Sequence, residues 1–347
     1  MSEDAERVDE SGEAKEEEPE EVVKIEKEEE PKKKGPQKNP LGFILNIRML
    51  RRVVQILFLL GINGYIFTAW YGAEQVTAFW TWFQSVLPAI PILSSLQAPF
   101  ATIAGSFDTI QYTLTRGVFP FFVIGAMIII LTIIGRASCG WACPIGTIQD
   151  FVTLPKRKKF RPAPGTESEL RKVKAYIFVV VGFLAVWMAV AKATGSSATL
   201  EAALGIFADD AFAPLNPAYI LFVILPNQTW PTSLDTLWFF STWGWVWLQV
   251  AFVSVVLIVS FWIPRWFCRW LCPAGFLYGI FSKEALIGIG RNPARCTPDT
   301  CNVCEVVCPM NIRIRKFPYQ HVHSPDCIMC LECKSHCPND AIALKFS

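Results

Sequence analysis

The chain has 347 residues, of which 52% are hydrophobic and 13 are tryptophan, and its formal net charge is +2. This apolar content is unusual for a soluble domain and indicates a membrane protein. Twelve cysteines at short, regular spacings in so long a chain favour cluster or metal ligation over a disulfide framework, and ligation requires reduced thiols.

Residues 1–40 are charged, with 15 acidic and 8 basic residues and few bulky apolar ones. Such a segment cannot bury enough apolar surface to offset the entropy lost on ordering, so we expect a disordered tail. The segment is acidic and is followed by no long apolar stretch before about residue 53, so we expect no cleavable signal peptide.

Residues 41–288 are predicted to form a membrane domain. A helix that crosses a bilayer needs about 20 apolar residues, and four stretches are long enough. They are residues 53–72, 117–136, 173–193 and 244–264. The fold class that we expect is a mainly α membrane protein with four transmembrane helices.

Basic residues gather at alternate ends of these stretches. They are Arg48, Arg51 and Arg52, the loop "PKRKKFRP" with Arg171, Lys172 and Lys174, and Arg265 with Arg269. Because cytoplasmic loops carry an excess of Lys and Arg, both termini are expected in the cytoplasm, with the protein in the inner or plasma membrane. Contact with anionic membrane lipid is expected at the same basic residues.

The two outer connections are apolar and rich in proline. They read "LPAIPILSSLQAPFATIAG" (87–105) and "ADDAFAPLNPAYILFVILP" (208–226). Neither resembles a full span, so we expect re-entrant or interfacial segments that pack against protein rather than lipid.

Two segments repeat the pattern C-x-W-x-C-P-x-G, at residues 139–146 and 268–275. Each copy follows a span, a proline-containing outer segment and a second span, which predicts two parallel repeats, at about 41–150 and 170–282. The copies then reach the same membrane face, where four thiols could meet. These are Cys139, Cys143, Cys268 and Cys272.

The spacing of the two cysteines in each copy is i, i+4, which on a helix places both sulfurs on one face, with the proline and glycine then ending the helix. The four thiols could hold an iron–sulfur cluster or another metal, or form a redox-active dithiol relay. The alternative is that they are spare packing thiols.

Residues 289–347 carry two further cysteine runs, "CTPDTCNVCEVVCP" (296–309) and "CIMCLECKSHCP" (327–338). The second is C-x2-C-x2-C-x3-C-P, in which three cysteines bind one cluster and the fourth binds the other. We therefore predict a cytoplasmic two-cluster ferredoxin-like α+β module with two [4Fe–4S] clusters. One set is Cys296, Cys301, Cys304 and Cys337, and the other is Cys327, Cys330, Cys333 and Cys308. The proline after each run and the strand expected at "NDAIAL" argue against four-cysteine zinc sites.

The chain has three histidines, and all lie in the C-terminal region. A b-type haem held by paired histidines therefore has no ligands in the expected spans. We expect His321 and His323 on an exposed loop between the clusters. No nucleic-acid-binding module is recognisable.

These motifs resemble the NapH/NosR-type membrane polyferredoxins. The resemblance covers about residues 41–347 and includes "RRVVQILFLLG" at the first span and "LRKVKAYIFVVV" at the third. It implies an integral-membrane electron-transfer protein, similar to the quinol-dehydrogenase subunit of periplasmic nitrate reductase systems. The large extracytoplasmic flavin domain of the NosR branch has no counterpart in this sequence.

The function that we expect is electron transfer between the quinone pool, or a membrane partner, and a partner oxidoreductase. No set of residues for bond-making catalysis stands out, and Asp108 is a candidate proton acceptor for quinol on the outer side. A second hypothesis is a maturation factor that reduces a metal ion or a disulfide, since the architecture also resembles copper-oxidase maturation proteins. A redox sensor is a third.

Overall fold

The computed structural model describes residues 47–62, 89–94, 104–155, 159–208, 210–225, 236–297 and 300–346, with isolated positions between 72 and 82. The expected tail (1–40) and most of the second half of the first expected span (53–72) lie outside the described residues. The described residues all belong to one compact unit.

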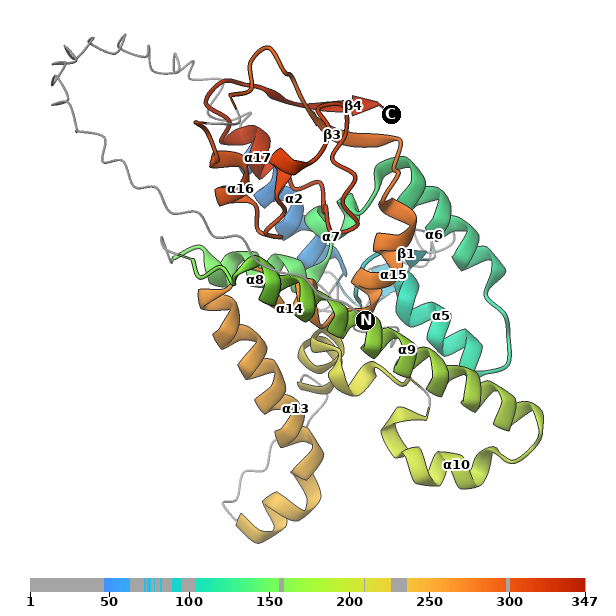
Figure 1. Ribbon diagram of the computed structural model, residues 1–347. Coiled ribbons are helices and arrows are strands. Elements are labelled where there is room, and N and C mark those ends of the chain that lie inside the picture. The colour runs from blue at the N-terminus through green and yellow to red at the C-terminus, as the bar shows by residue number, and fades with distance from the viewer. Residues whose placement is uncertain are drawn as a thin grey trace, which may run out of the picture. The chain divides into compact units, whose positions relative to one another are not determined.

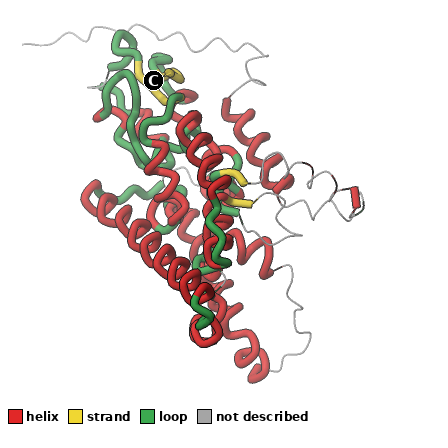
Figure 2. Tube along the Cα trace, turned by 90° about the vertical axis from the view of Figure 1, so that its right-hand side faces the viewer, coloured by secondary structure: helices red, strands yellow, loops and turns green. Residues whose placement is uncertain are grey.

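The described chain is mostly helical, as the fold prediction requires (Figures 1 and 2). Its α-helices are α2 (Ile47–Ile62), α5 (Ser106–Thr115), α6 (Phe121–Ile134), α7 (Ala137–Trp141), α8 (Pro144–Thr153), α9 (Pro164–Ala193), α10 (Ser197–Leu204), α11 (Pro217–Tyr219), α13 (Thr236–Trp262), α14 (Trp266–Trp270), α15 (Pro273–Ser282), α16 (Val303–Val307) and α17 (Glu332–Ser335). Single turns are η1 (Gly205–Phe207), η2 (Ala213–Leu215), η3 (Ile220–Ile224) and η4 (Ile314–Lys316). The strands are β1 (Ala89–Ile90), β2 (Ala104–Gly105), β3 (Ile287–Arg291) and β4 (Ile342–Phe346).

Helix α9 contains the third expected span, and among the described residues it alone is long and apolar enough to cross a membrane. It begins at Pro164, a residue whose fixed φ suits the first helical position. Helix α6 and residues 246–262 of α13 lie within the second and fourth expected spans and are apolar but shorter. Four spans therefore remain a prediction.

The two copies of the cysteine motif fold alike. A five-residue helix (α7, α14) is followed by a ten-residue helix (α8, α15), and the second cysteine of each motif is the N-cap between them. The expectation that one helix carries both cysteines and that proline ends it is therefore wrong. Proline lacks an N–H and has a preset φ, so Pro144 and Pro273 begin the next helix instead.

The described parts of the outer segments pack inside the protein. Strands β1 and β2 pair in parallel, and Ile92, Leu93 and Ser94 after β1 are buried. In the second segment, residues 211–214 are buried, and Asn216 accepts a hydrogen bond that caps α11. This burial is what non-helical backbone near a membrane interior would require.

The C-terminal region forms a small module in which β3 and β4 pair antiparallel. Helix α17 contacts α2, and β3 contacts α6, so the module packs against helices on the N-terminal side of the first motif. His321 is buried, at 6% exposure, and lies over the open backbone of Gly288 in β3. The expectation of an exposed His321 is therefore wrong, because a glycine in the strand leaves room for the ring.

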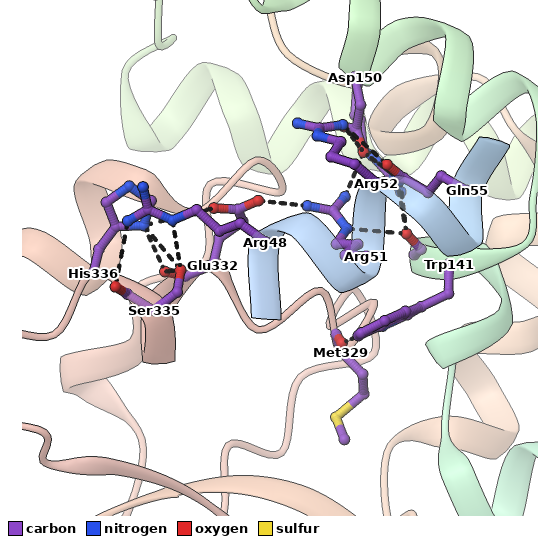
Figure 3. Close-up of polar contacts among 12 residues, drawn as sticks. Arg48, Arg51, Arg52, Gln55, Trp141, Asp150, Met329, Glu332, Ser335 and His336 are labelled. Atoms are coloured by element: carbon purple, nitrogen blue, oxygen red, sulfur yellow. Dashed lines mark hydrogen bonds and ion pairs between the residues drawn. The ribbon is translucent and has the colours of Figure 1, made fainter. Parts of the chain in front are cut away.

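A buried carboxylate joins three segments of the chain. Asp150 in α8 accepts hydrogen bonds from Arg51 and Gln55 of α2 (Figure 3). It also accepts two from Arg265, just before α14, at 2.7 and 2.8 Å. Burial alone would raise the pKa of the Asp150 carboxyl, but the guanidinium groups of Arg265 and Arg51 outweigh it and lower the pKa. From the sequence, both arginines were interpreted only as part of the positive-inside bias. In the structure each is at most 2% exposed and bound to Asp150.

We predict that Asp150→Asn lowers the free energy of unfolding by about 3–5 kcal/mol, because it leaves two buried guanidinium groups short of a counter-charge. The pKa of Asp150 is lower in the folded state, so its stabilisation is complete above about pH 4 and is lost as the pH falls toward the folded value. The measurement is detergent-solubilised unfolding as a function of pH. Glu169→Gln, in an exposed pair with Lys172, is the control. Equal stability of D150N and wild type at pH 7 would contradict the prediction.

Candidate functional site

All twelve cysteines are free thiols, and the structure places them around three cavities with four at each. The repeat site is lined by Cys139, Cys143, Cys268 and Cys272. The inner ferredoxin site is lined by Cys308, Cys327, Cys330 and Cys333. The outer ferredoxin site is lined by Cys296, Cys301, Cys304 and Cys337. These groupings are the same as the sets expected from the sequence.

The repeat site takes one cysteine pair from each motif. Backbone N–H of Gly275 donates to Cys272 Sγ at 3.3 Å, and Gln149 Nε2 donates to Cys268 Sγ at 3.6 Å. Donors aimed at sulfur stabilise the thiolate form that binds metals. The ring of Tyr278 lines the same cavity from α15.

Two short helices tie the ferredoxin sites together. Helix α16 carries Cys304 of the outer site and ends at Cys308 of the inner site. Helix α17 carries Cys333 of the inner site, and Cys337 of the outer site follows it. One helical turn therefore separates the sites at both points, which is the interlocked arrangement of two-cluster ferredoxins.

The donor set and the cavities fit a cluster better than a single ion. Thiolates that bind zinc lie about 2.3 Å from one ion, so they converge on a point. Among the described residues, which include all twelve cysteines, no group of three or more Cys, His, Asp or Glu side chains is arranged to hold one metal ion. Four thiols spread around a cavity suit a larger group, such as a [4Fe–4S] cluster.

Burial makes these thiols unusually weak acids. It raises the pKa of Cys268 and of Cys327 to about 12, and the pKa of Cys330 to about 11. Desolvation disfavours the charged thiolate and at Cys268 outweighs the nearby Arg265 guanidinium, so thiolates form here only with further positive charge. The iron of a cluster would supply that positive charge.

The repeat site and the inner ferredoxin site share a wall. Ile328 lines both cavities. The loop that carries Ile328 lies so close to α7 that a Cβ on Gly140 would be 2.2 Å from the Ile328 carbonyl oxygen. Trp141 Nε1 donates to the carbonyl of Met329 at 2.9 Å and fixes the same contact (Figure 3).

Sequence reasoning missed two residues of the repeat site. Arg136 and Arg265 line its cavity, and each is 1% exposed. Each precedes the first cysteine of its motif by three residues, so the motif could have been written R-x-x-C-x-W-x-C-P-x-G. That shared arginine was the available signal, but Arg265 was attributed to membrane topology and Arg136 was not considered.

Asp108 lies near the repeat site in α5 and is fully buried. Asn216 Nδ2 donates to Asp108 Oδ1 at 3.2 Å, whereas Oδ2 makes no hydrogen bond to any described residue. The preceding residue of α5 contacts Tyr278, because backbone N–H of Phe107 donates to Tyr278 Oη at 3.0 Å. Tyr278 thus lies between Asp108's helix and the cysteines.

A sequence family described as a 4Fe-4S binding domain matches residues 115–162 and 243–291. Each match contains one copy of the motif and hence two cysteines of the repeat site. The chain therefore has 4Fe–4S binding segments of the ferredoxin type. No solved structure gives a significant match to the chain.

Three related proteins extend the comparison. An uncharacterised protein of Methanocaldococcus jannaschii is 29% identical over 64% of this chain and 77% of its own length. YccM of Escherichia coli K12, provisionally named an electron transport protein, is 26% identical over 84% of this chain and 74% of its own. The ferredoxin-type protein NapH of Haemophilus influenzae is 24% identical over 62% of this chain and 65% of its own.

The motifs and the cavities define an iron–sulfur protein of the ferredoxin type. The chain is also similar to proteins named NapH, NosR and NirI, which points to one family within this class. The resemblance to the NapH/NosR-type polyferredoxins is confirmed at modest identity.

We predict that Gly140→Ala loosens the contact between the two neighbouring sites, because its Cβ would overlap a backbone oxygen that cannot move alone. The expected cost is about 1–3 kcal/mol, with faster hydrogen exchange in residues 327–331. Gly125→Ala in α6 is the matched control, since nothing lies within 4 Å of its added Cβ. Unchanged exchange in G140A would show that the contact is looser than described.

Proposed function

We propose that this chain is an integral-membrane electron-transfer protein that passes electrons between the quinone pool, or a membrane partner, and a partner oxidoreductase. The observation that carries the proposal is the row of three four-cysteine cavities. The repeat site and the inner ferredoxin site share Ile328, and the inner and outer ferredoxin sites share α16 and α17. Because neighbouring sites share a residue or a short helix, the three sites form a continuous route for electrons.

The three cavities suggest which cysteines hold each redox group. Two [4Fe–4S] clusters are held by the inner and outer ferredoxin sites, and a third cluster, a metal or a redox dithiol is held by the repeat site. We favour a cluster at the repeat site, because both segments that contribute to it match a 4Fe-4S binding family. A [4Fe–4S] cluster supplies reversible one-electron transfer. The chain acts as the electron-transfer subunit of a quinol-dehydrogenase-like oxidoreductase.

Apolar surface supports the membrane assignment. Phe121 of α6, Phe183 of α9 and Leu248 of α13 are each at least 60% exposed. Exposed apolar patches of this kind are covered by lipid or protein. We propose a multi-pass protein of the inner or plasma membrane with four spans and cytoplasmic termini, in which these helices contact membrane lipid.

The exposed end of the route suits a partner subunit. The outer ferredoxin site lies beside β4, where Leu344 and Phe346 are 43% and 78% exposed. Apolar side chains at a surface near a redox site are suited to docking of another protein. Relatives with names such as electron transport protein and ferredoxin-type protein support a redox partner here.

The opposite end of the route suits quinol oxidation. A quinol that becomes a quinone gives up two electrons, which leave one at a time along the route, and two protons. Asp108 Oδ2 is placed to take one proton, and the second passes to water. The buried carboxyl has Asn216 as its neutral partner, and Tyr278 lies between its helix and the repeat site.

We predict that the full-length protein binds about 12 iron atoms, four for each of three clusters. Cys139→Ala should lower the content to about eight, and so should Cys268→Ala, because each variant removes one ligand of the repeat site alone. The measurement is iron and acid-labile sulfide per chain, with EPR of the reduced protein. Zinc in place of iron, or a content of about eight in wild type, would remove the third cluster from the proposal.

We predict that Asp108→Asn slows reduction of the clusters by quinol at least tenfold, while dithionite still reduces them fully. The reason is that the amide cannot accept the quinol proton. Stopped-flow absorbance with each reductant is the measurement, and Glu201→Gln, an exposed carboxylate in α10, is the control. If quinol does not reduce the wild-type clusters but the protein reduces a copper ion or a disulfide, the maturation-factor hypothesis is favoured instead.

A further inference from the structure

Two buried arginines occupy equivalent positions next to the repeat site. Arg136 precedes α7 and Arg265 precedes α14, and both residues are 1% exposed and line the cavity. A buried guanidinium is costly unless it meets opposite charge, so two of them in one cavity wall require an explanation.

Each arginine reaches across to the other motif. A Cβ on Gly275 would lie 2.9 Å from Arg136 Nη2, and a Cβ on Gly146 would lie 3.2 Å from Arg265 Nη1. Gly146 and Gly275 are the equivalent last residues of the two motifs. The glycines therefore leave the space that the arginine of the opposite motif fills.

The carboxylates near these arginines do not balance their charge. Asp150 is shared by Arg265 and Arg51. Asp326 lies 3.5 Å from Arg136 and is also bound by Lys174 and by Arg171. In addition, Arg136 Nε has no hydrogen-bond partner among the described residues.

The excess positive charge faces the cysteines. Arg265 Nη1 donates to the backbone carbonyl of Cys139 at 2.9 Å. Arg136 Nη1 donates to the carbonyl of Pro325 at 2.8 Å, on the loop that continues into the inner ferredoxin site. Both guanidinium groups thus stand in the wall of a site whose four thiolates would be negative.

We propose that Arg136 and Arg265 are positioning residues that hold the negatively charged cluster of the repeat site and raise its reduction potential. The inference rests on the proposed function, which places a cluster there. Reduction adds one electron, supplied in the test by dithionite, and hence one negative charge. Fixed positive charge in a water-poor site stabilises that added charge. Charge, rather than packing, is the property that the two arginines contribute.

The test is a redox titration of the full-length protein followed by EPR. The signal of the repeat site is the one that Cys139→Ala removes, and the outer ferredoxin signal is the internal control. Arg136→Gln and Arg265→Gln should each lower the equilibrium constant for reduction of the repeat site about tenfold, which is about 59 mV more negative. Arg136→Lys and Arg265→Lys should restore most of the potential. Lys172→Gln, at an exposed position, should leave it unchanged.

The outcomes separate the two proposals. Gln variants that keep wild-type iron and an unchanged potential would overturn the role of the arginines and leave the cluster in place. Gln variants that lose iron while Lys variants keep both iron and potential would support it, whereas loss in both would assign the arginines to packing. Wild type with no signal that depends on Cys139 would instead remove the cluster, and with it the proposed route through the repeat site.

Discussion

The architecture depends on one buried carboxylate. Asp150 is bound at once by side chains from α2 and from the turn before α14, more than 90 residues away on either side. Without it, Arg265 would lose its carboxylate partner and Arg51 would keep only Glu332, so α2 and the two motifs would be joined mainly through the Gly140 carbonyl. Glu167 in α9 likewise joins distant segments, because it binds Arg269 of α14 and accepts a hydrogen bond from Trp270 Nε1 at 3.2 Å. The cysteines themselves make few contacts that could hold these elements together.

The walls between the sites are as specific as the ligands. The inner ferredoxin site is lined almost wholly by apolar side chains such as Ile289, Met310 and Ile328. Guanidinium groups line the repeat site on one side of it and the outer ferredoxin site, through Arg291, on the other. Four-cysteine sites of similar size thus differ chiefly in the charge around them, and charge is one of the properties by which a protein adjusts iron–sulfur potentials.

Sequence spacing was sufficient to group the twelve cysteines, because short intervals and a repeated motif leave few ways to arrange them. It also indicated the helical class and the family. It did not predict the break at Cys143, since an i, i+4 interval reads equally well as one helix or as a helix and an N-cap. Nor did it predict the ion pairs of Asp150 and Asp326, which join residues far apart in sequence. His321 was misplaced because the space over Gly288 appears only once the strand is folded.

The interlocking of the two ferredoxin sites sets an order of biosynthesis. Cys272 completes the repeat site's set of thiols, so that site has all its ligands before any residue of the C-terminal module has been translated. The first cysteine of the outer ferredoxin site to be translated is Cys296, and the last is Cys337. The first of the inner site is Cys308, and the last is Cys333. On the proposed cluster assignment, iron delivery must therefore finish after synthesis of this module, and a ribosome that stalls between Cys308 and Cys327 leaves four of its cysteines without the others of their sets.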